Sequence, residues 1–348
     1  MKRMSRRHFL KLCAASGAAV GLSQLWVPAI GEAFSKAAKG KPPVLWIQGS
    51  GCNGCSSSLI NALHPGMREF LTEIIDLPFH PSLASGGAPW EVARNNTGKF
   101  ILVIEGAIPK ANYGAFNIIG EDSSGKSIAL IDLLKSLGGM AGTVVAVGSC
   151  ASYGGISAAE PNDSNSVGVD NIIDVNKVIN IPGCPPHPDW IIGILSHLML
   201  YGKPDLDDFG RPKIFFSGLI HNNCPLRQYF DNSIFAEKFG DKGCMLQLGC
   251  KGPLTFGDCP TRFWNGTSSS WCVSSNAPCI GCTSPNFPDQ TMPFYHRMPG
   301  INTPAITATA DNIGLGLGAL TAVGIAAHLT GSYVVGRFNE KKQDKGGE

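Results

Sequence analysis

The sequence predicts an α/β protein with a doubly wound N-terminal domain, an irregular cysteine-rich C-terminal domain and one C-terminal helix able to span a membrane. Three observations support this prediction. From residue 42 to about 200, short apolar runs alternate with stretches of helical periodicity. From 201 to about 304 that alternation fades, and Gly, Pro, Ser, Asn and Cys predominate. Residues 313–335 then contain no Asp, Glu, Lys or Arg.

The candidate strands of the first domain are four short, continuously apolar runs with glycine at or near their ends. Such runs are typical of parallel strands that are buried on both faces. The segments between them are long enough for crossover helices, for example residues 127–138, so we expect a flavodoxin-like domain over 42–200. The runs are VLWIQG (44–49), FILVIEG (100–106), TVVAVGS (143–149) and VINIPG (178–183). A further β-like run, KIFFSGLI (213–220), opens the second domain.

Four cysteines follow these runs. Cys52 and Cys55 come after the first run, Cys150 after the third and Cys184 after the fourth. The carboxyl ends of parallel strands meet at one edge of the sheet, so these cysteines should lie together there. Four thiolates suit a structural zinc or an iron–sulfur cluster. Zinc sites usually combine two close pairs, whereas here one pair joins two single cysteines, which favours a cubane cluster.

Two further sets of four metal-ligating side chains follow in the second domain. One imidazole with three thiolates suits zinc or a cluster, although His221 taken alone is equally an ordinary loop histidine. Cys272 is alternatively a small buried hydrophobe. The sets are His221, Cys224, Cys244 and Cys250, and then Cys259, Cys272, Cys279 and Cys282.

The cysteine count supports this grouping. Of the 12 cysteines, Cys13 lies in the N-terminal segment that we expect to be removed. The remaining eleven are odd in number, which argues against a disulfide framework. Together with His221 they make three sets of four, the count expected for three cubane clusters in a row.

The N-terminus resembles a twin-arginine export signal. Residues 5–11 are SRRHFLK and precede a moderately apolar stretch, which predicts a signal peptide over residues 1–38 that is removed after export. A chance arginine pair before a buried helix is the alternative. This export route carries folded proteins, which suits a cofactor inserted in the cytoplasm.

The C-terminal apolar segment predicts a transmembrane anchor over residues 312–336. At about 1.5 Å per residue it is long enough to cross the hydrocarbon core, and a buried core helix is the alternative. Lysines and an arginine in the tail, residues 337–348, predict a cytoplasmic tail and an outward-facing body. His328 lies within the span, where it contacts a membrane partner or a haem, or is simply a polar residue in a helix interface.

Composition and motifs exclude several functions. A net charge of +2 makes nucleic acid a poor partner. The sequence has no Walker loop, nucleophile elbow or H-E-x-x-H motif, and Gly49-Ser50-Gly51 lacks the rest of a dinucleotide fingerprint. Because iron–sulfur centres pass single electrons, the chain is expected to move electrons for a partner that performs the chemistry.

The motifs around these residues resemble the small subunit of nickel–iron hydrogenases across essentially the whole chain. The resemblance implies that the chain is the electron-transfer subunit of a heterodimeric hydrogenase, whose large subunit splits H2. The matching stretches are WIQGSGCNGC (46–55), VIEGAIP (103–109), AVGSCASYGG (146–155), NIPGCPPHPDW (180–190), HNNCP (221–225), LGCKGP (248–253), CPTRFWN (259–265) and CIGC (279–282).

The resemblance also implies which cluster each set holds. Cys52, Cys55, Cys150 and Cys184 correspond to the proximal [4Fe–4S] cluster, and His221, Cys224, Cys244 and Cys250 to the distal [4Fe–4S] cluster. The medial cluster of most relatives is [3Fe–4S], with proline where this chain has Cys272. The nickel–iron–selenium branch has cysteine there, so we expect Cys259, Cys272, Cys279 and Cys282 to hold a medial [4Fe–4S] cluster. If Cys272 is not a ligand, a [3Fe–4S] cluster remains.

Several expectations about location and partners follow from the resemblance. The implied partners are a nickel–iron or nickel–iron–selenium large subunit, the lipid bilayer, and a membrane cytochrome b or other cytochrome acceptor. The implied location is the periplasmic face of the inner membrane. Glu105, at the end of the second run, has a role in proton movement or at the subunit interface, or instead caps backbone amides.

Two other classes of function compete with this interpretation. The first is an iron–sulfur relay subunit of another membrane-bound oxidoreductase such as a quinone reductase, which would lack the ligand block 221–282. The second is a surface protein stapled by zinc or disulfides. Iron and sulfide analysis separates that class from an iron–sulfur protein.

Overall fold

The computed structural model describes residues 41–335 except 64, 86–87, 123, 264–269, 297–300, 304–305 and 309. The predicted signal peptide, residues 1–38, and the tail, residues 337–348, lie outside the described residues. The chain divides into two compact units, residues 1–296 and residues 297–348, which are considered separately.

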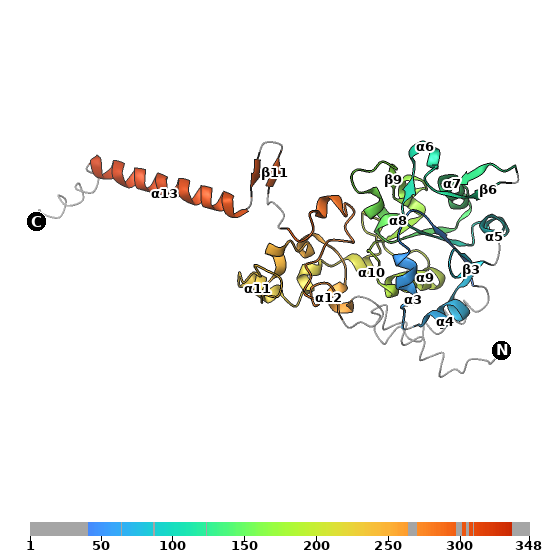
Figure 1. The fold of residues 1–348 in the computed structure, drawn as a ribbon. Helices are drawn as coiled ribbons and strands as arrows, with labels where there is room; N and C mark the ends of the chain where they lie inside the picture. The colour runs from blue at the N-terminus through green and yellow to red at the C-terminus, as the bar shows by residue number, and fades with distance from the viewer. Residues whose placement is uncertain are drawn as a thin grey trace, which may run out of the picture. The chain divides into compact units, whose positions relative to one another are not determined.

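A six-stranded sheet organises the first unit (Figure 1). Its order is β10-β8-β4-β1-β2-β3, and all neighbouring pairs are parallel except β2 with β3. The strands are β1 (Pro43–Gln48), β2 (Asp76–His80), β3 (Ala84–Ser85), β4 (Ile101–Glu105), β8 (Thr143–Val147) and β10 (Val178–Ile181).

The predicted parallel α/β sheet is confirmed. The four apolar runs form β1, β4, β8 and β10, and β4 is buried along its whole length. β2 was not predicted, because its sequence DLPFH is polar at both ends and mostly only half-buried. Its place beside β1 became evident only from the pairing of Pro43 with Asp76 and of Leu45 with Phe79.

Two apolar layers cover the faces of the sheet. Alternate residues of β1 enter different layers, Val44 and Trp46 on one face and Leu45 and Ile47 on the other. The first face packs against α3 (Gly54–Ile60) and α9 (Pro188–Tyr201), and the second against α5 (Pro89–Asn95) and α7 (Leu130–Met140) (Figure 1). Each fully buried aliphatic side chain contributes about 1.5–3 kcal/mol, so these layers fix the sheet edge independently of any ligand.

The remaining elements of the first unit are short. Between the sheet strands lie α4 (Met67–Glu69), the π-helix η2 (Phe70–Ile74), β5 (Ile108–Pro109), α6 (Ala111–Gly114), β6 (Ile118–Glu121), β7 (Ser127–Ala129), α8 (Ser149–Tyr153), η3 (Gly155–Ala158), β9 (Ser166–Val167), η4 (Val169–Asn171) and η5 (Val175–Lys177). After α9 lie α10 (Lys213–Phe216), η6 (Ile220–Asn223), α11 (Arg227–Asp231), η7 (Met245–Leu248), η8 (Gly252–Leu254), α12 (Cys259–Arg262) and η9 (Asp289–Thr291).

The run 213–220 begins with a short helix, α10 (Lys213–Phe216), and does not form the predicted strand. α10 begins directly after Pro212, and Phe215 and Phe216 are both buried in the same apolar layer as α9. Periodicity cannot distinguish so short an apolar run from a buried helical segment. Proline before the first turn, with its fixed φ, favours the helix.

The second unit contains a hairpin and one long helix. β11 (Ile301–Thr303) pairs antiparallel with β12 (Ile306–Ala308), and α13 covers Ala310–Val334. Within the described residues this is the one helix long and apolar enough to cross a membrane, over Ile313–Val334 with a mean hydropathy of 1.6. Its apolar side chains are exposed within the unit, for example Leu315 at 76%.

Candidate functional site

The four cysteines that follow the sheet strands converge at the carboxyl edge of the sheet. Cys52 follows β1, Cys55 lies in α3, Cys150 lies in α8 and Cys184 follows β10. Burial raises the pKa of Cys55 well above its usual value, and Glu105 and the other three thiols raise it further. Thiols that repel one another in this way share one space, and a bound cation relieves the repulsion. We call these four cysteines the proximal group.

Two glycines allow this close approach. Gly148 has φ +88°, and a Cβ there would collide with the sulfur of Cys55. Gly106 has φ +90°, and its Cβ would lie 2.8 Å from the carbonyl carbon of Gly49. Only glycine satisfies both the left-handed backbone and the missing volume at these positions. The loops after β1, β4 and β8 can therefore lie close together beside the four cysteines without steric overlap.

Glu105 caps the helix that carries Cys55. Its carboxylate is buried at the end of β4 and accepts hydrogen bonds from the backbone N–H of Cys55 at 3.0 Å and of Ser56 at 3.1 Å. It also accepts from Trp46 Nε1 at 3.0 Å and from the Ser56 hydroxyl. Of the two roles considered for Glu105, capping of backbone amides is the one that these contacts display.

A buried histidine that the motifs did not single out extends this network. His80 Nδ1 accepts from the backbone N–H of Ser82 at 3.1 Å, which places the proton of the neutral ring on Nε2. Nε2 lies 3.1 Å from Ser56 Oγ. Burial lowers the pKa of His80, and Glu105 opposes that shift. The chain His80–Ser56–Glu105 thus fixes the base of the Cys55 helix.

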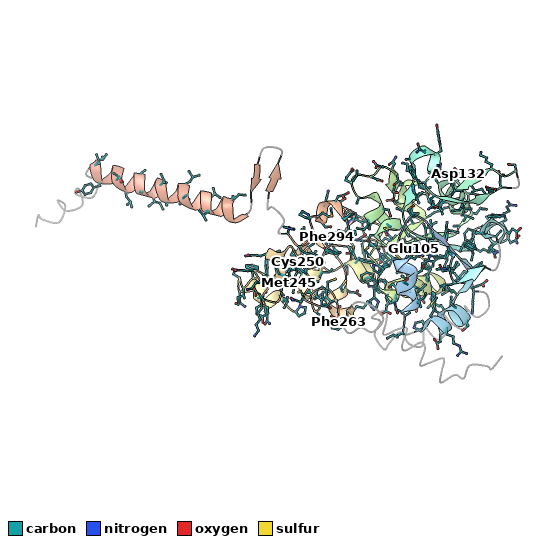
Figure 2. The ribbon with its side chains drawn as sticks, in the orientation of Figure 1. Glu105, Asp132, Met245, Cys250, Phe263 and Phe294 are labelled. Carbon is teal, nitrogen blue, oxygen red and sulfur yellow. The ribbon has the colours of Figure 1, made fainter. Side chains whose placement is uncertain are left out.

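The second predicted set lines one cavity in the cysteine-rich part of the unit. The cavity is lined by His221, Cys224, Cys244 and Cys250, which we call the distal group, together with Ile220, Leu226, Met245, Gly252, Trp271 and Val273. Burial, followed by the nearby guanidinium of Arg227, lowers the pKa of His221, which favours the neutral imidazole that a metal ligand requires. Figure 2 labels Met245 and Cys250 in this region.

The third predicted set lies beside the second. Burial raises the pKa of Cys259 well above its usual value, and Cys282, Cys279 and Cys272 raise it further. Burial and then Cys272 raise the pKa of Cys282 to about 12. All four thiols therefore lie close enough to interact, including Cys272, although this residue is exposed. We call these four cysteines the medial group.

Direct contacts connect the three groups into a row. Ser149, next to the proximal Cys150, donates its hydroxyl to the carbonyl of the medial Cys282. Lys251, next to the distal Cys250, donates its backbone N–H to the carbonyl of the medial Cys279 at 2.7 Å. The medial group is therefore the middle member of a proximal–medial–distal series.

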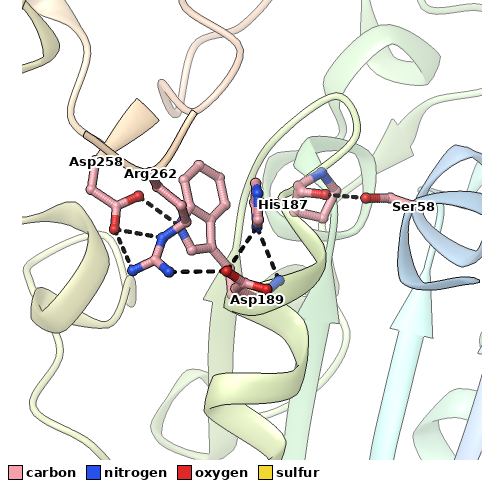
Figure 3. A network of polar contacts seen from close by, with 7 residues as sticks. Ser58, His187, Asp189, Asp258 and Arg262 are labelled. Carbon is pink, nitrogen blue, oxygen red and sulfur yellow. Dashed lines mark hydrogen bonds and ion pairs between the residues drawn. The ribbon is translucent and has the colours of Figure 1, made fainter. Parts of the chain in front are cut away.

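A charged network also ties the sheet to the medial group (Figure 3). Arg262 pairs with Asp258 at 2.8 Å and with Asp189 at 3.1 Å, and Asp258 accepts from Trp190 Nε1 at 2.8 Å. Asp189 and Trp190 open α9, just after the proximal Cys184, whereas Asp258 precedes the medial Cys259. The sequence did not predict this network. Asp189 and Trp190 lie in the motif 180–190 and Arg262 lies in the motif 259–265, but the two motifs do not show that these side chains pair.

The chemistry of the donors bears on what the three sets could hold. Together they offer eleven thiols and one imidazole, in three sets of four. Thiolate and imidazole are the ligands that iron–sulfur clusters take, so the donor sets fit such clusters. His328, in α13, belongs to the other unit.

Two family comparisons cover most of the first unit. Residues 216–295 match the family described as the C-terminal part of the NiFe/NiFeSe hydrogenase small subunit. Residues 52–198 match the family described as NADH ubiquinone oxidoreductase, 20 Kd subunit. The first match spans the distal and medial groups, and the second spans the proximal group.

Similarity over the length of the chain decides the identification. The chain is 46% identical to the periplasmic [NiFeSe] hydrogenase small subunit of Desulfomicrobium baculatum, over 84% of this chain and 98% of that relative. It belongs to the small-subunit family of the nickel–iron and nickel–iron–selenium hydrogenases. This membership confirms the resemblance that the motifs indicated.

Other members of the hydrogenase family agree. The uptake hydrogenase small subunit of Azotobacter vinelandii is 35% identical over 93% of this chain and 91% of its own length. Among solved structures, a reduced, active form of the Ni-Fe-Se hydrogenase from Desulfomicrobium baculatum is 44% identical with a TM-score of 0.69. That match covers 74% of this chain and all of the other chain.

Proposed function

We propose that this hydrogenase small subunit relays electrons from H2 oxidation in a partner large subunit to an acceptor at the periplasmic face of the membrane. The observation that carries the proposal is the unbroken proximal–medial–distal series of ligand groups within a member of this family. The relatives' names, periplasmic and uptake hydrogenase, support the direction and location.

The three groups would each hold one [4Fe–4S] cluster. When bound, such clusters accept and pass on single electrons. The ligands would be Cys52, Cys55, Cys150 and Cys184 for the proximal cluster, Cys259, Cys272, Cys279 and Cys282 for the medial cluster, and His221, Cys224, Cys244 and Cys250 for the distal cluster.

The chain's own residues supply positioning and electrostatics. Glu105 and the sheet hold the Cys55 helix, and the Arg262 network holds the medial segment at a fixed separation from it. Cys52 and Cys184 are exposed, so the large subunit is expected to dock on that edge and exclude water. The neutral imidazole of His221 makes the distal site less negative than four thiolates would.

The domain that carries the proximal group would be flavodoxin-like. Its five parallel strands, numbered along the chain, stand in the order 2-1-3-4-5, and this order is typical of flavodoxin-type doubly wound sheets. In that fold, ligands bind beyond the carboxyl ends of the strands, where the proximal group lies.

Cys272 would convert the medial site to a [4Fe–4S] centre. In addition to burial, Cys272 raises the pKa of Cys259, Cys279 and Cys282, which supports this assignment, and the distal Cys250 in turn raises the pKa of Cys272. Replacing Cys272 by proline should produce a [3Fe–4S] EPR signal, near one spin per chain, in anaerobically oxidised protein, and should raise the medial reduction potential. A stoichiometric [3Fe–4S] signal in the unaltered protein would contradict the assignment.

α13 would anchor the subunit, with residues 337–348 in the cytoplasm and His328 facing a membrane cytochrome b or another cytochrome. The length and apolar surface of the helix support this proposal, as does the twin-arginine motif for export of the folded chain. A chain ending before residue 312 should move from the membrane to the soluble periplasmic fraction. Recovery of the full chain in the soluble fraction would contradict the proposal that α13 is a membrane anchor.

The test of the proposed function is purification of the complex from its membrane. The expected result is a heterodimer that reduces a dye with H2 and holds about twelve iron atoms and twelve sulfides in the small subunit, as three cubanes require. Absence of iron, or of H2-dependent dye reduction in an intact heterodimer, would overturn it.

A second candidate is the relay subunit of a quinone reductase, favoured by the family match over residues 52–198. The hydrogenase-specific match over 216–295, which contains the medial and distal groups, favours the first candidate. The co-purifying large subunit separates them, because a hydrogenase partner contains nickel.

A further inference from the structure

Trp271 has a buried indole N–H with no partner among the described residues. The side chain is only 3% exposed, and within that part of the chain Nε1 has no hydrogen-bond acceptor. The indole nitrogen is a donor only, and an unsatisfied buried donor costs about 1–3 kcal/mol. Native proteins rarely leave such a donor unpaired, which indicates that a group outside the described residues accepts this hydrogen bond.

The surroundings of Trp271 identify the chemistry of that acceptor. Trp271 lines the cavity of the distal group, and the side chains that share the wall with the four ligands are apolar. Those apolar residues are Ile220, Leu226, Met245 and Val273. Among the side chains that line this cavity, the acceptors available to the indole are the four ligand groups, or a cofactor that they hold, and the weakly accepting thioether sulfur of Met245.

The other buried indoles provide a contrast. Trp46 Nε1 donates to Glu105 at 3.0 Å, and Trp190 Nε1 donates to Asp258 at 2.8 Å. Both rings are about as buried as Trp271, at 1% and 2% exposed. The described part of the chain thus provides a carboxylate for two indoles and none for the indole at the distal cavity.

We propose that Trp271 donates an N–H···S hydrogen bond to the cluster held by the distal group and thereby raises its reduction potential. This inference rests on the proposed distal [4Fe–4S] cluster. Reduction adds negative charge to the cluster, so a donor stabilises the reduced form more than the oxidised form. With the His221 imidazole, this bond makes the last centre of the series an easier electron acceptor.

The direct test uses the intact heterodimer with 15N-labelled tryptophan. The distal cluster is recognised by the imidazole nitrogen coupled to its EPR signal in pulsed measurements on the reduced protein. In the unaltered protein we expect an additional indole 15N coupling and an exchangeable proton coupling that disappears in D2O. Absence of both couplings from the imidazole-coupled signal, or their presence only on another cluster, overturns the inference.

The variant Trp271→Phe removes the donor and keeps an aromatic ring. In a redox titration, the distal midpoint should become more negative by about 59 mV, which corresponds to a tenfold change for a one-electron couple. Trp46→Phe, which removes a buried indole N–H bonded to Glu105, is the matched control and should leave the distal midpoint unchanged. An unchanged midpoint in a fully loaded Trp271→Phe protein contradicts the inference.

The experiments distinguish failure of the proposed distal cluster from failure of the proposed Trp271 hydrogen bond. If no imidazole-coupled cluster signal exists and iron is missing, the distal cluster itself is wrong. If that signal is present without indole coupling, only the role of Trp271 is wrong. Should Trp271→Phe fail to load its clusters, the labelled unaltered protein still decides the question.

Discussion

The sheet region, residues 41–200, places its candidate ligand cysteines at the rim of a large apolar core, whereas in the cysteine-rich region, residues 213–296, several cysteines belong to a small apolar core or pack against it. Two apolar layers cover the sheet and contain every strand that leads to the proximal group. The cysteine-rich region has a much smaller apolar cluster among its described residues, and Cys279 belongs to it with Cys224, Cys250 and Cys259 packed against it.

This difference teaches how each region acquires its stability. In the sheet region, hydrophobic burial shapes the site before any metal binds. In the cysteine-rich region, short helices and turns bury little apolar surface, so we expect the proposed metal–ligand bonds to supply much of the folding free energy. The two regions should therefore respond differently to removal of iron and to mutation.

Iron removal should have the largest effect. Chelation of iron from the purified subunit should abolish hydrogen-exchange protection across residues 213–296, because the ligand shell is also the core there. The strands β4 and β8 should remain protected. Hydrogen-exchange mass spectrometry measures both regions in one sample, and anaerobic reconstitution with iron and sulfide is the control. Simultaneous loss of protection in both regions would show that they do not differ in their dependence on iron.

Breaking the connection between the regions should have the next largest effect. Arg262→Gln leaves Asp189 and Asp258 without their cation in a site where Arg262 is only 13% exposed, and should lower the free energy of unfolding by about 3–5 kcal/mol. The matched control is Arg227→Gln, which breaks the exposed pair with Asp231 and should cost about 0–1 kcal/mol. Denaturant titration of the loaded protein measures both, and equal losses would contradict the network's role.

The cap on the proximal helix should matter less. In Glu105→Gln the amide NH2 group cannot accept, so two donors lose their acceptor in either orientation of the amide. These are Trp46 Nε1 and the Ser56 hydroxyl, or the backbone N–H groups of Cys55 and Ser56. We expect a loss of about 1–3 kcal/mol and a weaker proximal cluster signal in EPR. Glu91→Gln, an exposed change in α5, is the control and should have almost no effect. Unaltered stability and signal in the Glu105→Gln protein would show that the cap is dispensable.

The smallest effect should come from pH. Burial lowers the folded-state pKa of His80, so the unfolded chain binds its proton at a higher pH than the folded chain does. His80 therefore costs the folded state no stability above the unfolded pKa of about 6.5, where the ring is neutral in both states. As the pH falls below that value, the free energy of unfolding declines by at most about 1.4 kcal/mol per pH unit. Replacing His80 by Gln should flatten the stability profile between about pH 7 and pH 5, on either side of that unfolded pKa. If stability changes with pH equally in the two proteins, His80 does not contribute to the pH dependence.

Local sequence patterns predicted much of the fold and of the candidate site. The apolar runs at 44–49, 100–106, 143–149 and 178–183 predicted four of the parallel strands, because burial on both faces leaves a continuous apolar signal. The position of the cysteines after those strands predicted the proximal group, and motif similarity predicted the family. The cluster types, the anchor and the acceptor remain predictions.

Only the tertiary structure decided the remaining features. β2 has a weak apolar signal and exists because β1 pairs with it, and residues 213–216 form a helix because their two phenylalanines pack beneath the sheet. His80 joins Ser56 and Glu105 from distant parts of the chain, and Trp271 shares a cavity with His221. Strand periodicity and ligand spacing act over a few residues, whereas these contacts join residues far apart in sequence. The sequence therefore determined which side chains are able to hold metal, and packing determined which other side chains surround them.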